Sequence, residues 1–200
     1  MKHSTSPKDA SHESDVPGVR KENRKVRYTK MVLRDSLMEL MKTKSILSIT
    51  IKDICDLADI SRSTFYAHYK DQYDMLRQIE EETLAYFEDM LNKYKDLRSK
   101  NATTEMVEAM LTYIANNGNS IQVLLSENGD IDFQRKMFVH FTNHTHVKRY
   151  LSDKNQDDET KAVYSVFLIH GAMGVVQHWL KENTSMPVQK LAKIILRMTE

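Results

Sequence analysis

A run of hydrogen-bond donors without a single carboxylate lies at residues 61–70, and such side chains can bind the phosphates and base edges of nucleic acids. An ordinary exposed helix would mix aspartate and glutamate into its polar side. Arg62, Ser63 and Thr64 are expected to reach base edges, because they lie near the start of the expected helix, and the tyrosine, histidine and lysine that follow are expected to contact phosphates. The candidate DNA-binding residues of this run are Ser61, Arg62, Ser63, Thr64, Tyr66, His68, Tyr69 and Lys70.

These donors need a scaffold, and the hydrophobic pattern predicts a helix-turn-helix unit around them. Apolar residues at three- and four-residue steps predict a first helix over 28–43. Thr50, with an aspartate three positions later, forms an acidic variant of a capping box and predicts a second helix over 51–58. Residues 59–61 allow only a tight turn, after which Ser61 can cap a third helix. Two short helices after a stabilising first one are the arrangement of a helix-turn-helix DNA-binding unit.

Four apolar residues, Ile54, Ala58, Ile60 and Phe65, are expected to form the small core that sets the angle between these helices. Cys55 is expected to be a small buried residue where the helices come closest. It is the only cysteine of the chain, so an intrachain disulfide and a four-thiolate zinc site are both excluded.

A basic segment precedes the first helix, although the net charge of the whole chain is only +1. Residues 20–30 contain six lysines and arginines and one acidic residue. A short charge run is more often a solvated surface than a nucleic-acid contact, but its place next to the helix-turn-helix favours an arm lying along the DNA backbone or in the minor groove. Arg24, Lys25 and Arg27 are the candidates in this arm, and Thr50 is expected to clamp a phosphate at the start of its helix.

Residues 28–80 resemble the DNA-binding domain of the TetR family of transcriptional regulators. The family signature, Ser-x-x-Thr-x-Tyr-x-His-Phe/Tyr, is present here as Ser61, Thr64, Tyr66, His68 and Tyr69. The resemblance implies an all-α homodimer, an N-terminal domain that binds a palindromic operator, and a C-terminal domain that dimerises and often holds a small-molecule effector.

Two positions depart from the family pattern. Asp59 stands where the family usually has glycine in a left-handed conformation, which aspartate tolerates better than most residues. Gln72 replaces a lysine that is common at the start of the fourth helix, and Lys70 could substitute for it as a phosphate contact.

The rest of the chain is also expected to be helical, since no proline occurs between residues 18 and 186 and strand patterns are lacking. About nine helices are expected in an all-α fold. The sequence predicts a disordered leader over 1–19, a helix-turn-helix domain with its basic arm over 20–75, and a helical dimerisation and effector-binding domain over 76–200. The helices expected after the first three are a long one of about 24 residues from Gln72, Thr104 to Asn116, Ile121 to Leu125, Ile131 to Leu151, Asp157 to Leu180, and Val188 to Met198.

Gly171 and Gly174 lie inside an expected helix, where each costs about 1 kcal/mol relative to alanine. Close approach of a helix from a second subunit would compensate for this cost. Residues 167–181 also resemble the C-terminal region of a TetR branch that includes the coactivator of dihydroxyacetone kinase expression, which supports a four-helix dimer interface. The candidate interface residues are Val166, His170, Gly171, Gly174, Gln177, His178, Ile194 and Ile195.

An effector pocket is the second candidate site, because several of the twelve methionines lie on expected inner faces and could line an adaptable apolar cavity. Core packing explains these methionines equally well. His140, His144 and His146 are not expected to bind metal, since they do not share one helical face and no carboxylate lies nearby. The candidate pocket residues are Phe87, Met90, Met106, Met110, Phe138 and Phe141.

The pattern as a whole favours a cytoplasmic, dimeric regulator that acts as a repressor and leaves a palindromic operator when a small-molecule effector binds. One alternative is a ligand-responsive coactivator or adaptor that acts through a protein partner without operator binding. Another is a carrier of apolar ligands or an enzyme in the C-terminal domain, although phosphate-binding loops and nucleophile motifs are lacking.

No cofactor or metal is expected. No apolar stretch of about 18 residues occurs, so neither a membrane span nor an export signal is expected.

Overall fold

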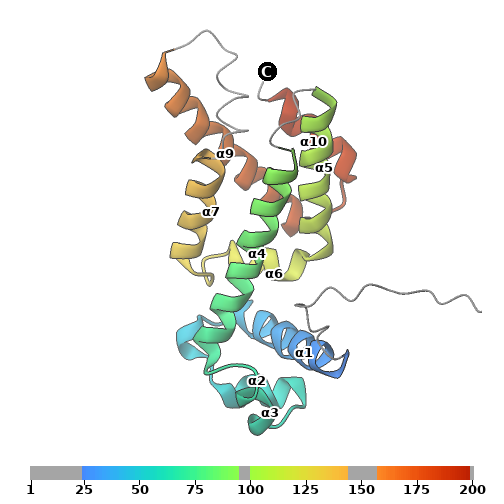
Figure 1. The fold of residues 1–200 in the computed structure, drawn as a ribbon, viewed down its shortest axis with the longest axis vertical. Coiled ribbons are helices and arrows are strands. Elements are labelled where there is room, and N and C mark those ends of the chain that lie inside the picture. Colours follow the sequence, from blue (N-terminus) through green and yellow to red (C-terminus); the bar gives the residue numbers. More distant parts are fainter. Residues whose placement is uncertain (1–23, 95–99, 144–156, 199–200) are drawn as a thin grey trace, which may run out of the picture.

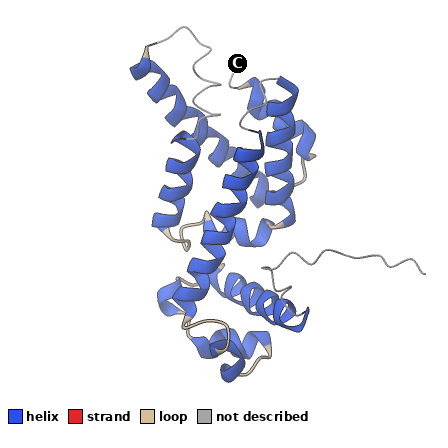
Figure 2. Cartoon of the chain, viewed as in Figure 1, coloured by secondary structure: helices blue, strands red, loops and turns tan. Residues whose placement is uncertain are grey.

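The computed structural model describes residues 24–94, 100–143 and 157–198, and within these ranges every regular element is a helix (Figure 2). Nine α-helices and one short 3-10 helix are found in this part of the chain. The predicted all-α fold is therefore confirmed. The expected leader over 1–19 lies outside the described residues.

The N-terminal unit contains α1 (Arg24–Met41), the 3-10 helix η1 (Ile46–Ser48), α2 (Ile51–Ala58) and α3 (Arg62–Tyr66). Helix α1 begins four residues before its expected start, because the basic residues of its first turn carry no apolar stripe that would reveal it. Of the four residues expected to form the small core, Ile54, Ala58 and Phe65 are buried, whereas Ile60 is only half-buried. Leu33 and Leu37 of α1 are completely buried in the same core.

Side-chain caps define the ends of the two short helices. The Thr50 hydroxyl accepts the Asp53 N–H at 3.2 Å while the Asp53 carboxylate accepts the Thr50 N–H at 2.9 Å, which completes the predicted capping box. Asp59 ends α2 in the left-handed conformation (φ 52°, ψ 44°), as the comparison with the family pattern predicted. Ser61 Oγ then accepts the Thr64 N–H at 3.2 Å and starts α3.

Helix α4 (Gln72–Tyr94) is the element that joins the N-terminal unit to the rest of the molecule (Figure 1). Its 23 residues span about 34 Å. Asp71 caps its first turn by accepting the Asp74 N–H at 2.7 Å, as expected. The beginning of α4 packs on α1, and its later turns pack on helices of the C-terminal region, so one helix contacts both parts of the chain.

The C-terminal region consists of α5 (Lys100–Asn116), α6 (Gly118–Leu124), α7 (Ile131–Asn143), α9 (Asp158–Lys181) and α10 (Val188–Arg197). Helix α10 packs on α5, and the short α6 packs on both α1 and α9 (Figure 1). Helices α5 and α6 begin earlier than expected, at Lys100 and Gly118. The expected extension of α7 as far as Leu151 falls outside the described residues.

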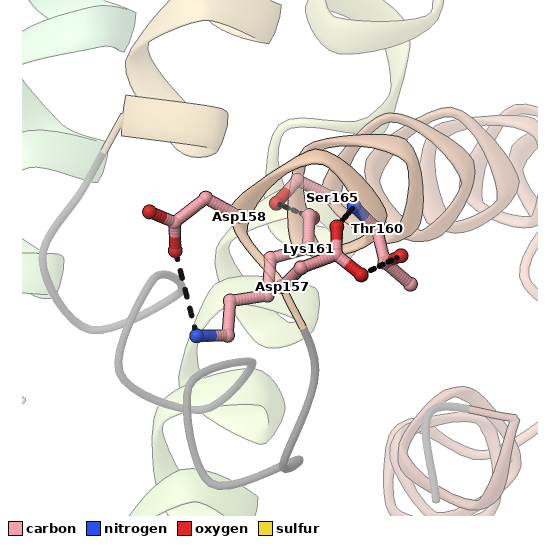
Figure 3. Close-up of polar contacts among 5 residues, drawn as sticks. All are labelled: Asp157, Asp158, Thr160, Lys161 and Ser165. Atoms are coloured by element: carbon pink, nitrogen blue, oxygen red, sulfur yellow. Dashed lines mark hydrogen bonds and ion pairs between the residues drawn. The ribbon is translucent and has the colours of Figure 1, made fainter.

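The start of α9 is set by a compact group of polar contacts (Figure 3). Asp157 accepts hydrogen bonds from the backbone N–H and the hydroxyl of Thr160, each at 2.8 Å, and these bonds hold the pKa of the Asp157 carboxyl below its ordinary value. Lys161 forms an ion pair with Asp158 at 3.6 Å in the same turn. The helix is thus fixed at its N-terminus by its own first residues.

Candidate DNA-binding surface and apolar cavity

The exposed face of α3 carries the donors that the sequence singled out. Phe65 is fully buried and anchors the helix, which leaves Arg62, Ser63 and Tyr66 on the outer side. The Tyr66 side chain is 57% exposed although it is a large aromatic residue. An exposed aromatic with a hydroxyl donor, next to an exposed arginine and without a carboxylate between residues 61 and 70, suits a phosphate-bearing partner.

Hydroxyl groups at the start of α3 form one cluster. Ser61 Oγ lies 2.9 Å from both Ser63 Oγ and Thr64 Oγ1. Because Ser61 also caps the helix, its first role is to hold α3 in place, while the exposed Ser63 and the half-buried Thr64 lie beside it on the outer side. His68 is half-buried and Lys70 is exposed just after the helix.

Tyr69 does not belong to the exposed face, which corrects its assignment as a DNA contact. Its side chain is 3% exposed, and its ring centroid lies 5.7 Å from that of Phe65. The signature motif in this chain therefore contains both exposed and buried residues. Its last aromatic, Tyr69, packs in the core and supports the exposed residues of the motif.

Thr50 is exposed at the start of α2, but its hydroxyl is already engaged. It donates to the Asp53 carboxylate at 2.7 Å and accepts the Asp53 N–H. These contacts hold the pKa of Asp53 below its ordinary value, so the carboxylate stays charged. The Thr50 hydroxyl therefore already donates one hydrogen bond and accepts another, and the charged Asp53 carboxylate lies beside it. Both features disfavour the predicted contact between Thr50 and a phosphate.

The basic residues of α1 divide into two groups. Arg24 and Lys25 are exposed in the first turn, as a DNA-binding arm requires. Arg27 instead lines a hollow between α1 and helices α4, α5 and α6. This hollow lies on the side of α1 that faces the C-terminal region, whereas α3 lies beyond the other side (Figure 1).

Cys55 is buried, as expected. Burial raises the pKa of its thiol above the ordinary value, which keeps the sulfur protonated. Among the described residues, no group of three or more histidine, cysteine or acidic side chains could hold a metal ion. His144 and His146 lie outside this part of the chain.

An apolar cavity of about 220 Å³ lies within the C-terminal region, lined by residues of α4 to α7, α9 and α10. Among the described residues that line it, Thr103 alone has a polar side chain. Four of the predicted pocket residues line it: Phe87, Met106, Met110 and Phe141. Met90 and Phe138 do not line it, and the Phe138 ring centroid lies 4.1 Å from that of His170.

Met173 of α9 was among the methionines expected on inner faces and does line this cavity, whereas the other contributions of α9 and α10 were not predicted. The contributing residues are Leu168, Ile169, Ala172, Met173 and Val176 of α9, and Ile195 and Leu196 of α10. Apolar residues surround most of α9, so the periodicity of this helix could not show which side faces the interior.

A second feature of α9 is a stripe of exposed residues along its outer side, which we call the α9 stripe. A Cβ atom built at Gly171 or Gly174 would meet nothing within 4 Å, so both glycines face open space in a single chain. Phe167 is 69% exposed, which is unusual for a phenylalanine. The stripe consists of Val163, Val166, Phe167, His170, Gly171, Gly174 and His178.

The other predicted interface residues lie elsewhere. Gln177 donates from Nε2 to the Leu125 carbonyl at 2.8 Å, so its side chain links α9 to the end of α6 in the same chain. Ile194 is half-buried, and Ile195 lines the apolar cavity.

Among the described helices, α9 alone is long and apolar enough to cross a membrane by length and composition.

Solved structures with the same fold are regulators of transcription. A TetR transcriptional regulator from Streptococcus agalactiae aligns with a TM-score of 0.60 at 23% identity, over 88% of this chain and 96% of that one. The dihydroxyacetone kinase operon activator DhaS aligns with a TM-score of 0.51 at 17% identity, over 86% and 93% of the two chains. The regulator FadR from Bacillus subtilis, in complex with stearoyl-CoA, aligns with a TM-score of 0.61 at 15% identity, over 84% and 96%.

Sequence comparison leads to the same family. No curated protein sequence matches the chain at a significant level. The TetR family model described as the C-terminal region of a transcriptional regulator matches residues 101–200, which is half of the chain. The N-terminal signature and this match cover different parts of the sequence and agree, so the chain belongs to the TetR family of transcriptional regulators.

Proposed function

We propose that the protein is a homodimeric transcriptional repressor of the cytoplasm, which binds a palindromic operator and leaves it when a small apolar molecule occupies the cavity. The observation that carries this proposal is the outer face of α3, where exposed donors stand on a helix-turn-helix unit without any carboxylate between residues 61 and 70. Such a face suits the major groove, where arginine and hydroxyl side chains can read base edges.

Dimerisation is supported by the α9 stripe. The two glycines would allow a helix of a second chain to approach closely, and the exposed Phe167 and Val166 would be buried against it. A bilayer is a poorer explanation, because His170 and His178 lie in the same stripe and Asp158 and Glu159 begin the helix. A two-fold dimer would set its recognition helices about 34 to 36 Å apart, or somewhat more, on successive major grooves.

Effector binding is supported by the lining of the apolar cavity. An engineered cavity of about 150 Å³ is known to hold benzene, so one of about 220 Å³ is large enough for a small apolar compound. The similar FadR structure was solved with stearoyl-CoA. Release from DNA follows if the effector binds preferentially to the arrangement of helices that does not fit the operator.

The test is a titration of the full-length protein against labelled DNA from the region upstream of its own gene, with excess nonspecific competitor and at several salt concentrations. We expect binding that survives competitor and has a salt slope of several charges. The double variant Tyr66→Phe with His68→Ala should weaken binding to all DNA, and Arg62→Ala should change sequence preference. Arg77→Ala, which removes an exposed arginine from α4, serves as the matched control.

A coactivator acting through a protein partner is the second candidate, favoured by the structural similarity to the operon activator DhaS. Complete lack of DNA binding at low salt would exclude the repressor and support this alternative. Dimerisation is tested separately by sedimentation of Phe167→Glu, which should dissociate into monomers if the α9 stripe is the interface.

A further inference from the structure

A polar hollow of about 390 Å³ lies where the DNA-binding unit meets the C-terminal region, and it is separate from the apolar cavity. Its walls come from α1, from the middle of α4, and from the end of α5 with the beginning of α6. The lining residues that carry charged or hydrogen-bonding side chains are Arg27, Lys30, Arg34, Asp35, Glu82, Thr83, Tyr113, Asn117 and Ser120.

Three cations of this hollow come from one face of α1. Arg27, Lys30 and Arg34 are three and four residues apart, so helical periodicity places them on one side of the helix. Two carboxylates also line the hollow, which leaves an excess of one positive charge. Glu82 is engaged already, because it accepts a hydrogen bond from Arg34 Nη2.

The arginines retain donors for a further partner. Arg34 Nε is buried and has no hydrogen-bond partner among the described residues, although the same guanidinium binds Glu82. Arg27 is exposed and forms no ion pair within the described ranges. Across the hollow, Asn117 uses its amide nitrogen toward the Tyr113 carbonyl at 2.9 Å, which leaves a second N–H on that nitrogen, and Ser120 adds a hydroxyl.

We propose that this hollow binds a small anion through a carboxylate or phosphate group, held by Arg27 and Arg34 on one side and by Asn117 and Ser120 on the other. Arginine suits this role because its planar guanidinium donates several hydrogen bonds to the oxygens of one anionic group. Since the two walls belong to α1 and to the α5–α6 corner, a bound anion bridges the DNA-binding unit and the C-terminal region. Occupancy would therefore favour one arrangement of the two parts.

The proposal is tested by titrating the DNA-free, full-length protein with inorganic phosphate and, separately, with citrate, in calorimetry at constant ionic strength. We expect saturable binding of at least one of the two anions, and the comparison shows whether phosphate or carboxylate is preferred. Arg27→Gln should weaken this binding about tenfold, the loss expected for one charge-assisted hydrogen bond. Ser120→Ala should weaken it less, and Arg77→Gln on the exposed side of α4 should leave it unchanged.

Hydrogen exchange locates the anion independently of the variants. Protection of amides in α1 and α6 on addition of the anion supports the hollow as the site. Protection confined to α2 and α3 would overturn the proposal, because the anion would then occupy the DNA-binding face. Lack of saturable binding with both anions, or an equal loss in Arg27→Gln and Arg77→Gln, would overturn it as well.

Discussion

Glu80 is a buried carboxyl at the point where α4 leaves the DNA-binding unit, and replacing it should change how stability depends on pH. Its side chain is 7% exposed, and its Oε1 has no hydrogen-bond partner among the described residues. Burial, together with the nearby carboxylates of Asp130 and Glu81, raises the pKa of Glu80 from 4.5 to about 7 against the opposing effect of Lys136 and Arg77. The charged form is therefore disfavoured in the folded protein.

The sign of the effect follows from the direction of this shift. The folded state binds the Glu80 proton more tightly than the unfolded state, so stability from this group is complete below about pH 4.5 and is lost as the pH rises to about 7. This difference in the pKa of Glu80 between the folded and unfolded states corresponds to about 3 kcal/mol of unfolding free energy. Between about pH 5 and pH 8, ionisation of Glu80 lowers the free energy of unfolding by about 2.5 kcal/mol.

Glu80→Gln keeps the shape of the side chain and removes the titration. We expect urea unfolding, followed by circular dichroism at fixed protein concentration, to show that the variant is more stable than the wild type at pH 8 by up to about 3 kcal/mol and by much less at pH 5. Glu88→Gln, at an exposed position later in α4, should track the wild type. An identical stability difference between Glu80→Gln and wild type at both pH values would refute the reasoning.

Three further substitutions test local features of the backbone, each by the same unfolding measurement. Thr50→Ala should destabilise the protein by about 1 kcal/mol through loss of the capping box, whereas Thr50→Ser should retain most of the stability. Asp59→Gly should exceed Asp59→Ala in stability by about 1 to 2 kcal/mol, because the residue is left-handed; equal stabilities would contradict this. Gly129→Ala should cost about 1 to 3 kcal/mol, since the added Cβ would lie 2.3 Å from the Leu124 carbonyl oxygen. A neutral Gly129→Ala would show that the loop has room to shift.

Local sequence signals predicted the N-terminal unit well. Capping by Thr50 and Ser61 depends on residues within four positions of one another, so the local pattern contains the necessary information, whereas the left-handed Asp59 was predicted from the family resemblance. Tyr69 was assigned wrongly because a tyrosine next to a donor-rich face can pack in the core or point outward. Its contact with Phe65 decides between these two possibilities.

Contacts between distant segments could not be read from the sequence. Glu80 lies on a helix that looks amphipathic, yet its side chain is buried, and its pKa responds to the charges of Asp130 and Lys136, some fifty residues later in the chain. The same holds for Gln177, whose partner is the carbonyl of Leu125. In both cases the neighbouring group comes from a distant segment of the chain, and helical periodicity shows which face of a helix is apolar but not what packs against it.

Helix α6 is placed to link the apolar cavity to the DNA-binding unit. Ile121, which is 4% exposed, lines both the apolar cavity and the polar hollow, so the two spaces share this side chain as part of their walls. The helix that carries it packs directly on α1. A molecule that enlarges the cavity by displacing this side chain would move α6, because closely packed interiors transmit displacement. Since α1 holds α2 and α3 through their shared core, a shift of α6 would move the recognition helix without any contact between ligand and DNA.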